Sequence, residues 1–195
     1  MSRIYAFQDP EIGREISFRP ATVEDDLDRV HDWMNRPHVT PFWDLARPVE
    51  GIRKYIEESL AAEHQTPYIG CLDGEPVSYW EAYRVPEDVV GRYYDTDPGD
   101  RGVHLLIGPP EYLGRGLALP LLRAMTAFQL SYPGTRRVVA EPDVRNGRMI
   151  HVFQRSGYEG QKEITLPDKR ATLMFCDKDR FRELFGALFA EEVTR

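Results

Sequence analysis

Hydrophobic residues along this chain recur in some stretches at the spacing of a helix and in others at the spacing of a strand. Leu27, Val30 and Met34 share one helical face, and Thr22 with Asp25 forms a capping pair ahead of them. The same criterion predicts helices over residues 22–35, 49–63, 111–128, 145–157 and 179–192. These five segments account for the long amphipathic stretches of the chain.

Short apolar runs between these helices predict strands. Two strands within residues 67–85 flank Asp73-Gly74, a dipeptide typical of tight hairpins. Further strands are expected over residues 14–22, 103–108, 136–141 and 170–176. Because a helix joins the strands over residues 103–108 and 136–141, these two should lie parallel through a right-handed crossover.

The order of these elements predicts an α/β fold with a central, twisted, mixed sheet flanked by helices. We expect one domain over residues 14–195, preceded by an N-terminal extension over residues 1–13. A polar segment over residues 86–102 separates the hairpin from the next strand, and connections of that length are typical of functional loops.

Composition narrows the classes of partner. Of 195 residues, 42% are hydrophobic and 29% charged, and the formal net charge is −7. No dense Lys/Arg cluster favours a nucleic acid, no apolar run is long enough to span a bilayer, and no secretory signal is evident. We therefore expect a cytoplasmic protein without nucleic-acid or membrane partners. Cys71 and Cys176 make neither a disulfide framework nor a metal motif, so no metal is expected.

The stretch EYLGRGLALPLLRAMTAF places Gly114 and Gly116 directly before an apolar helix. A strand, a glycine turn and a helix N-terminus together favour anion binding, because the first N–H groups of a helix lack internal partners. A plain turn with small residues is the alternative. Pro120 would clash with the carbonyl of Gly116 inside a helix, so the regular helix either starts near Leu117 or has a distorted first turn.

Several segments, in order, carry a resemblance to a known family. YLGRGLA, the preceding VHLLIG and the following EPDVRNGRMIHVFQRSGYE resemble the GNAT superfamily of acyl-coenzyme A-dependent N-acyltransferases. HDWMNRPHVTPFW, GEPVSYWEAY and YYDTDPGDRGVHLLIG resemble its branch that makes hydroxamate siderophores. Members of that branch acylate N-hydroxylysine, N-hydroxyornithine, N-hydroxycadaverine or N-hydroxyputrescine. The resemblance implies transfer from acetyl-CoA or succinyl-CoA to an N-hydroxylated diamine or diamino acid, for iron acquisition.

The resemblance also implies where coenzyme A binds. The glycine turn would hold its pyrophosphate, and strand N–H groups would polarise the thioester carbonyl. The residues implied at this site are Leu105, Leu106, Ile107, Tyr112, Leu113, Gly114, Arg115, Gly116, Leu117, Asn146 and Phe153. Asn146 is equally well explained as a helix cap.

Two positions depart from the superfamily pattern. Glu111 stands where Gln or Arg is usual, and its carboxylate should point away from the pyrophosphate. Phe153 stands where many members have the tyrosine that protonates the leaving thiolate. No tyrosine acid is therefore expected at that position.

His104 and Asp143 are the residues expected to do the chemistry. In related siderophore and lysine acyltransferases a histidine on this strand and an acid after the next parallel strand are the candidate bases. His104 is favoured as the base because an ordinary imidazole titrates near neutrality. Asp143 is expected to orient the histidine or to bind the nitrogen of the acceptor, and a helix cap is its alternative role.

Aromatic and acidic residues are expected to form the acceptor site. They are Phe42, Trp43, Trp80, Glu81, Tyr94 and Asp95. The tryptophans would cover a methylene chain and the carboxylates would receive a distal ammonium, although sheet packing and a solvated surface are the alternatives. Because no basic cluster is evident near them, a diamine is favoured over a diamino acid.

Two other functions remain open. A lysine side chain or an aminoglycoside is a rival acceptor, and a non-catalytic acyl-CoA-binding sensor is a rival of another class. The chain is expected to act as a monomer or a homodimer.

Overall fold

The computed structural model describes residues 5–43 and 47–189. Its eight-stranded sheet has the order β1-β2-β3-β4-β5-β6-β8-β7. The strands are β1 (Tyr5–Asp9), β2 (Arg14–Pro20), β3 (Gln65–Leu72), β4 (Glu75–Arg84), β5 (Arg101–Ile107), β6 (Arg137–Ala140), β7 (Glu159–Thr165) and β8 (Arg170–Asp177). The helices are α1 (Val23–Met34), α2 (Val49–Ala61), α3 (Ala118–Ser131), α4 (Gly147–Arg155) and α5 (Lys178–Phe185). The predicted mixed sheet flanked by helices is confirmed.

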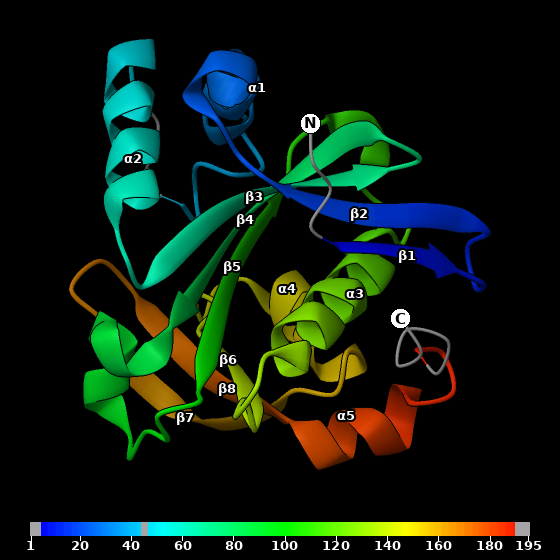
Figure 1. The fold of residues 1–195 in the computed structure, drawn as a ribbon. Coiled ribbons are helices and arrows are strands. Elements are labelled where there is room, and N and C mark those ends of the chain that lie inside the picture. The colour runs from blue at the N-terminus through cyan, green and yellow to red at the C-terminus, as the bar shows by residue number, and fades with distance from the viewer. Residues whose placement is uncertain (1–4, 44–46, 190–195) are drawn as a thin grey trace.

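The parallel pair β5–β6 is the point at which the sheet opens. All other neighbouring strands pair antiparallel, and only Arg101 and Gly102 at the start of β5 have partners on β6. Figure 1 shows β5 running away from β6 beyond this point. The later residues of β5 therefore keep β4 on one edge and have no strand on the other.

Helices cover both faces of the sheet. Helices α1 and α2 lie over one face, whereas α3 and α4 lie over the other (Figure 1). Along β5, Val103 belongs to the buried cluster under α3 and Leu106 to the cluster under α1 and α2. This confirms the predicted alternation and places His104 on the same face of β5 as Leu106.

Local sequence signals set several of these boundaries. Thr22 Oγ1 accepts the N–H of Asp25 at the start of α1, as predicted, while Asp26 rather than Asp25 accepts the N–H of Thr22. Asp73 and Gly74 both have positive φ, at 50° and 84°, which is the geometry of a two-residue hairpin turn. Helix α3 begins at Ala118, so Pro120 lies in its first turn, where it leaves no hydrogen bond unmade.

Two strands lie outside the residue ranges predicted for strands. Residues 5–9, within the expected N-terminal extension, form β1, which pairs with β2 along its whole length. Residues 159–165, for which no range was predicted, form β7 and pair with β8. Strand β7 is at the edge of the sheet and is mostly exposed. Its sequence therefore lacks the alternation of apolar and polar residues that predicts a strand.

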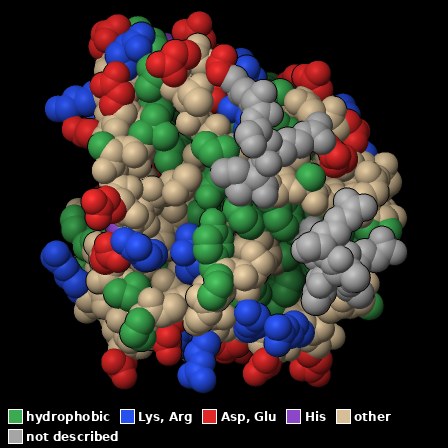
Figure 2. Space-filling model, in the orientation of Figure 1, with side chains coloured by type: hydrophobic (Ala, Val, Ile, Leu, Met, Phe, Trp, Pro, Cys, Tyr) green, Lys and Arg blue, Asp and Glu red, His purple; other side chains and the backbone are tan. Residues whose placement is uncertain are grey.

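The surface carries charged side chains of both signs. Acidic and basic side chains are interspersed on the face drawn in Figure 2. Within residues 5–43 and 47–189, every helix falls short of the length and apolar character that crossing a bilayer requires.

Gly102 lies where the sheet opens and is in close contact with the ring of Tyr83. It faces Tyr83 across the β4–β5 pair, and a methyl group at Gly102 would lie 2.1 Å from the Tyr83 ring. Tyr83 is fully buried, so its ring has no free space into which to move. The absence of a side chain at this position is therefore what allows the ring to lie flat over the strand.

Replacing Gly102 by Ala is expected to destabilise the fold by about 1–3 kcal/mol, the usual cost of overpacking. Gly160→Ala on β7 is the matched control, because a methyl group there would meet its nearest atom at an ordinary 3.6 Å. Urea denaturation of both variants measures the difference. Equal stability of the two variants would show that Tyr83 yields freely.

Candidate active site

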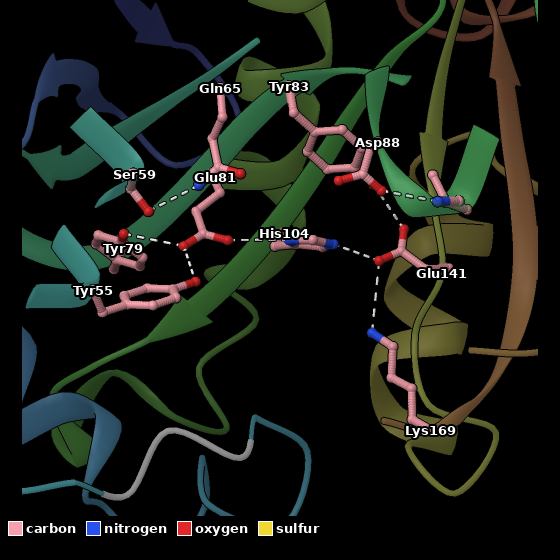
Figure 3. A network of polar contacts seen from close by, with 11 residues as sticks. Tyr55, Ser59, Gln65, Tyr79, Glu81, Tyr83, Asp88, His104, Glu141 and Lys169 are labelled. Carbon is pink, nitrogen blue, oxygen red and sulfur yellow. Dashed lines mark hydrogen bonds and ion pairs between the residues drawn. The ribbon is translucent and has the colours of Figure 1, made fainter. Parts of the chain in front are cut away.

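His104 lies between two glutamates on the open part of the sheet. Its Nδ1 is 3.2 Å from Glu81 Oε2, and its Nε2 contacts Glu141 Oε1 closely. The glutamates are almost fully buried, at 2% and 4% exposure, while the histidine side chain is 30% exposed. Figure 3 shows the imidazole as the link between the two carboxylates.

Strand register brings these three side chains together. Glu81 of β4 is directly opposite His104 of β5. Gly102 is opposite Val139 in the parallel pair, so two residues further along His104 comes level with Glu141, the residue after β6. Because side chains two residues apart point to the same face, all three project toward α2.

The Glu81 carboxylate has two further partners. Its Oε1 accepts hydrogen bonds from the hydroxyl of Tyr79, at 3.1 Å, and from that of Tyr55 on α2. Burial together with the charge of Glu81 raises the pKa of both tyrosines well above the ordinary value. Both hydroxyls therefore act as donors to this carboxylate.

The Glu141 carboxylate is held in the same way from the other side. Tyr83 donates its hydroxyl to Oε2 at 2.9 Å, and Lys169 Nζ lies 3.6 Å from Oε1. Lys169 belongs to the turn between β7 and β8. The cluster thus contains two anions, Glu81 and Glu141, and two cations if the imidazole is protonated.

Electrostatics favour the protonated ring. Burial disfavours its charge, but attraction to Glu141 and hydrogen bonds to Glu141 and Glu81 outweigh burial and raise the pKa of His104 to about 10. Burial likewise acts to raise the pKa of Glu141, and the charge of His104 outweighs it and lowers that pKa to about 2. These contacts favour an imidazolium at His104 and raise its pKa above the ordinary value on which the expectation of titration near neutrality relied.

Asp143 is not the group that orients His104. Its carboxylate instead forms a two-pronged pair with Arg145, with contacts of 2.6 Å and 2.9 Å, which lowers the pKa of Asp143. Arg145 also donates to the carbonyl oxygen of Pro41 at 3.1 Å. The pair therefore ties the segment before α4 to the segment that leads into Trp43.

Trp43 covers the histidine. Its ring packs edge-on against His104 at a centroid distance of 6.0 Å, and its contact with Tyr79, at 5.9 Å, is tilted. Phe42 is 38% exposed beside it. Trp43 therefore lies directly against His104. Trp80 is on the opposite face of β4, fully buried, with its Nε1 bonded to Ser78 Oγ, so its predicted contact with the acceptor is wrong.

Tyr94 and Asp95 do not join Glu81. The Tyr94 hydroxyl donates to Asp100 at 2.8 Å, and its ring packs on Phe175. Asp95 is exposed, and its carbonyl accepts a hydrogen bond from Arg137 at the start of β6. Both were expected at the acceptor site on sequence grounds, and the compact turns after β4 direct them elsewhere.

The glycine turn has the geometry of an anion site. Gly114 and Gly116 have φ of +71° and +76°, and open space surrounds both. Leu113 and Arg115 beside them are exposed, and Leu117 is the N-cap of α3. Among the described residues, no acceptor is found for the N–H groups from position 114 to position 118. Glu111 is exposed, and Tyr112 is half-buried against the core.

The open edge of β5 offers further donors. Gly108 N–H donates to Val77 on β4, so by alternation Leu106 also bonds to β4, whereas Leu105 and Ile107 direct their N–H groups away from it. His38 Nε2 lies 2.9 Å from the Ile107 carbonyl on that free edge. Of the three strand residues predicted to polarise a thioester, Leu105 and Ile107 have the required direction.

The two remaining residues that were predicted to contact coenzyme A, Asn146 and Phe153, belong to helix α4 and its N-cap. Asn146 is its N-cap, with Oδ1 accepting the N–H of Met149 at 3.2 Å. Phe153 is 4% exposed and packs edge-on against Tyr158 in the core. Phe153 therefore has little surface to offer coenzyme A, contrary to its predicted role.

A protein-family model for the acetyltransferase (GNAT) domain matches residues 22–166. The chain belongs to the GNAT acetyltransferase family. Membership confirms the resemblance noted from the sequence and makes this an acyltransferase domain of the GNAT type.

Three individual proteins show how far the similarity extends. The chain is 38% identical over 179 residues to N(6)-hydroxylysine O-acetyltransferase of Escherichia coli, a match that covers 91% of this chain and 57% of that protein. An uncharacterized protein from Bacillus halodurans has a solved structure with a TM-score of 0.92 and 42% identity, over 96% of each chain. The aminoglycoside acetyltransferase AAC(6')-Ib, solved with coenzyme A, has a TM-score of 0.79 and 31% identity, over 86% of this chain and 98% of that one.

Five residues of the His104 cluster were not predicted as site residues: Tyr55, Tyr79, Tyr83, Glu141 and Lys169. Glu141 carried a usable signal, because the argument that pointed to Asp143, the carboxyl end of a parallel strand, applies more directly to the residue next to β6. Tyr79 and Tyr83 are two residues either side of Glu81 on β4, and strand alternation places all three on one face. Tyr55 and Lys169 reach the cluster from α2 and the β7–β8 turn, through packing that no spacing in the chain encodes.

Among residues 5–43 and 47–189, the His, Cys, Asp and Glu side chains form no group suited to hold a metal ion. Both cysteines are buried, and burial raises the pKa of the Cys176 thiol.

His104→Gln is expected to lower the free energy of unfolding most strongly near pH 6. A raised pKa stabilises the folded state fully below the ordinary value of 6.5, and that contribution is lost as pH rises toward about 10. The loss should stay below the about 3–5 kcal/mol typical of a broken buried pair, since the ring is partly exposed. Urea denaturation at pH 6, 8 and 10 measures it.

The exposed residue His151 on α4 supplies the control variant, His151→Gln. Its effect on stability should be small at all three values of pH. A deficit for His104→Gln that does not shrink with rising pH would contradict the imidazolium assignment.

Proposed function

We propose that this GNAT domain transfers an acetyl- or succinyl-type group from acyl-CoA to the nitrogen of an N-hydroxylated diamine or diamino acid, which yields a hydroxamate. The observation that carries the proposal is the free edge of β5. It lies between an anion site at the start of α3 and the His104 cluster. A thioester along that edge would have its phosphates at one end and its acceptor at the other.

Donor binding rests on the glycine turn. Free N–H groups at a helix N-terminus favour a phosphate, and the helix dipole adds to the attraction. Arg115 adds an exposed positive charge. The solved complex of AAC(6')-Ib with coenzyme A supports an acyl-CoA co-substrate in this family.

Carbonyl activation would come from β5. The Leu105 and Ile107 N–H groups point to the free edge and are fixed by the strand, so no reorganisation is needed when charge develops on the thioester oxygen. No cysteine is near His104 in the described network, so direct transfer is proposed rather than an acyl-enzyme. Much of the rate would then come from positioning the two substrates.

The acceptor site is lined by Trp43, the Glu81–His104–Glu141 cluster and the Asp143–Arg145 pair. The preference for a diamine relied on an apparent lack of basic residues, and the structure removes that basis, because Lys169 and Arg145 lie beside the carboxylates. Arg145 is 70% exposed and suits a carboxylate of the acceptor. Both acceptor types therefore stay within the proposal, set in siderophore assembly in the cytoplasm.

An aminoglycoside is the second candidate acceptor. The observation that favours it is the similarity to AAC(6')-Ib over 86% of this chain. The similarity to N(6)-hydroxylysine O-acetyltransferase is higher, at 38% identity, but the chain spans only 57% of that protein. The relative kcat/KM for an N-hydroxylated amine and for an aminoglycoside decides between these two acceptors.

Gly116→Val should weaken coenzyme A binding at least tenfold, because a branched side chain at φ +76° strains the turn and fills the phosphate position. Gly134→Val is the matched control, with φ of +82°, open space and a place at the other end of α3. Isothermal titration calorimetry of both folded variants measures the affinity. Equal affinities would refute the site.

The acceptor is tested by thiol release with acetyl-CoA and succinyl-CoA. N-hydroxylysine and N-hydroxycadaverine should be used with higher kcat/KM than kanamycin, and mass spectrometry with ferric hydroxamate colour should identify the product. A preference for kanamycin would promote the aminoglycoside alternative. Release with none of the acceptors, by a protein that binds acyl-CoA, would favour the sensor.

Asp143→Asn supplies a third measurement on the same reaction. The amide keeps the shape but loses the charge that holds Arg145, so the tie to Pro41 and the cover over His104 should loosen. KM for the acceptor should rise several-fold while coenzyme A affinity is unchanged. An unchanged KM would mean that the Asp143–Arg145 pair has no part in acceptor binding.

A further inference from the structure

The His104 cluster has an unusual arrangement of protons. A neutral imidazole has one N–H donor and one bare acceptor nitrogen. Here each ring nitrogen faces a glutamate oxygen, Glu81 at Nδ1 and Glu141 at Nε2. Two ionised carboxylates can both be satisfied only by a ring that carries a proton on each nitrogen.

The surroundings of each carboxylate support its ionised state. Tyrosine hydroxyls donate to both, from Tyr55 and Tyr79 on one side and Tyr83 on the other. Lys169 adds a positive charge near Glu141. The remaining neighbour of the ring is the uncharged indole of Trp43. Around the imidazole there is thus no bare nitrogen that can take a proton.

Other bases near the acceptor are also occupied. Asp143 is neutralised by Arg145, and a lowered pKa makes its carboxylate a weak base. His38 on the free edge contacts the Ile107 carbonyl through Nε2, which fixes that nitrogen as a donor. Among the described residues, the Glu81–His104–Glu141 cluster and the Asp143–Arg145 pair offer an alkylammonium no bare nitrogen to remove its proton; His38, held through Nε2 on the Ile107 carbonyl, keeps Nδ1 as its bare nitrogen.

We infer that Glu81 and Glu141, by holding a proton on each nitrogen of His104, restrict the reaction to acceptors whose attacking nitrogen arrives uncharged. An N-hydroxylated amine meets this condition near neutral pH because it is much less basic than an alkylamine. A plain alkylamine, with an ordinary pKa of about 10.4 as in lysine, does not. This inference rests on the proposed function and adds the origin of its selectivity.

The charge of the cluster acts in the same direction. Two anions, Glu81 and Glu141, are matched by two cations, His104 and Lys169. An added ammonium would be desolvated without net attraction, whereas an uncharged nitrogen avoids that cost. Charge and proton occupancy thus both disfavour the plain amine.

The chemical step balances without a protein base. The lone pair of the neutral nitrogen forms the C–N bond, the C–S bond breaks, and the electron pair of that bond leaves with sulfur. The nitrogen loses one proton to water and the thiolate takes one from water, so the products are the hydroxamate and the free thiol of coenzyme A. His104 stays protonated throughout and acts as a positioning residue.

The selectivity experiment compares N-hydroxycadaverine with cadaverine, which share a methylene chain and a distal ammonium. At pH 7.5 the wild-type protein should prefer the hydroxylated acceptor in kcat/KM by roughly 100-fold or more, the lower range of what a missing general base costs. Toward pH 10 the preference should shrink, because the plain amine then loses its own proton. A preference near unity at pH 7.5 would overturn the inference.

Glu141→Gln tests the origin of the preference. The amide removes one carboxylate from His104, so the ring should lose a proton more easily and the preference should narrow by about tenfold. Glu159→Gln is the matched control, because Glu159 is 54% exposed and pairs with Arg180 on α5 rather than with a member of the cluster. An unchanged preference in Glu141→Gln, with the variant folded by circular dichroism, would contradict the assignment.

Ring ¹⁵N NMR of the wild-type protein gives a readout that is independent of turnover. Both ring nitrogens of His104 should be protonated at pH 8, and one should lose its proton at lower pH in Glu141→Gln. A neutral ring at pH 8 alongside turnover of N-hydroxycadaverine would overturn this inference and leave the proposed function intact. No thiol release with either acceptor would contradict the proposed function, and the inferred selectivity would fall with it.

Discussion

The ion pair between His104 and Glu141 joins the two parts of the sheet where it opens. Strand β5 has only two partner residues on β6, and beyond them the strands are linked through this side-chain contact instead of backbone hydrogen bonds. Glu81 anchors the same ring to β4. The opening that leaves the Leu105 and Ile107 N–H groups without a strand partner among the described residues therefore has a charged bridge across its base. His104 links the two strands through both of its ring nitrogens, and those nitrogens are then not free to act as a base.

The packing around this bridge explains why it survives burial. Buried charges are costly unless each has partners, and here the remaining oxygens of both carboxylates are bonded by tyrosine hydroxyls. Tyr83 reaches Glu141 only because Gly102 leaves room for its ring. The glycine at position 102 of β5 thus affects the ionisation of Glu141 through the ring of Tyr83.

Much of the fold follows from local patterns, and the site only in part. The cap at Thr22, the Asp73-Gly74 turn and the glycine turn before α3 are all readable because each depends on residues adjacent in sequence. His104 and Trp43 were found through family resemblance. Trp80 was misplaced because strand alternation defines two faces but does not say which face holds the site. The state of His104 was not predictable, since it depends on Glu141 and Lys169, which come from distant segments.

The neutral sum of charges in the His104 cluster has a consequence for ionic strength. Opposite charges in the cluster are a few ångströms apart, so their electric fields largely cancel at distances beyond about 8 Å, the screening length in physiological salt. Dissolved ions therefore change the electrostatic energy of the cluster little. The exposed Arg115 at the glycine turn has no such counter-charge within the described contacts. Salt is therefore expected to act differently on the two regions: screening weakens the attraction of an anion to the glycine turn, whereas it changes little at the His104 cluster.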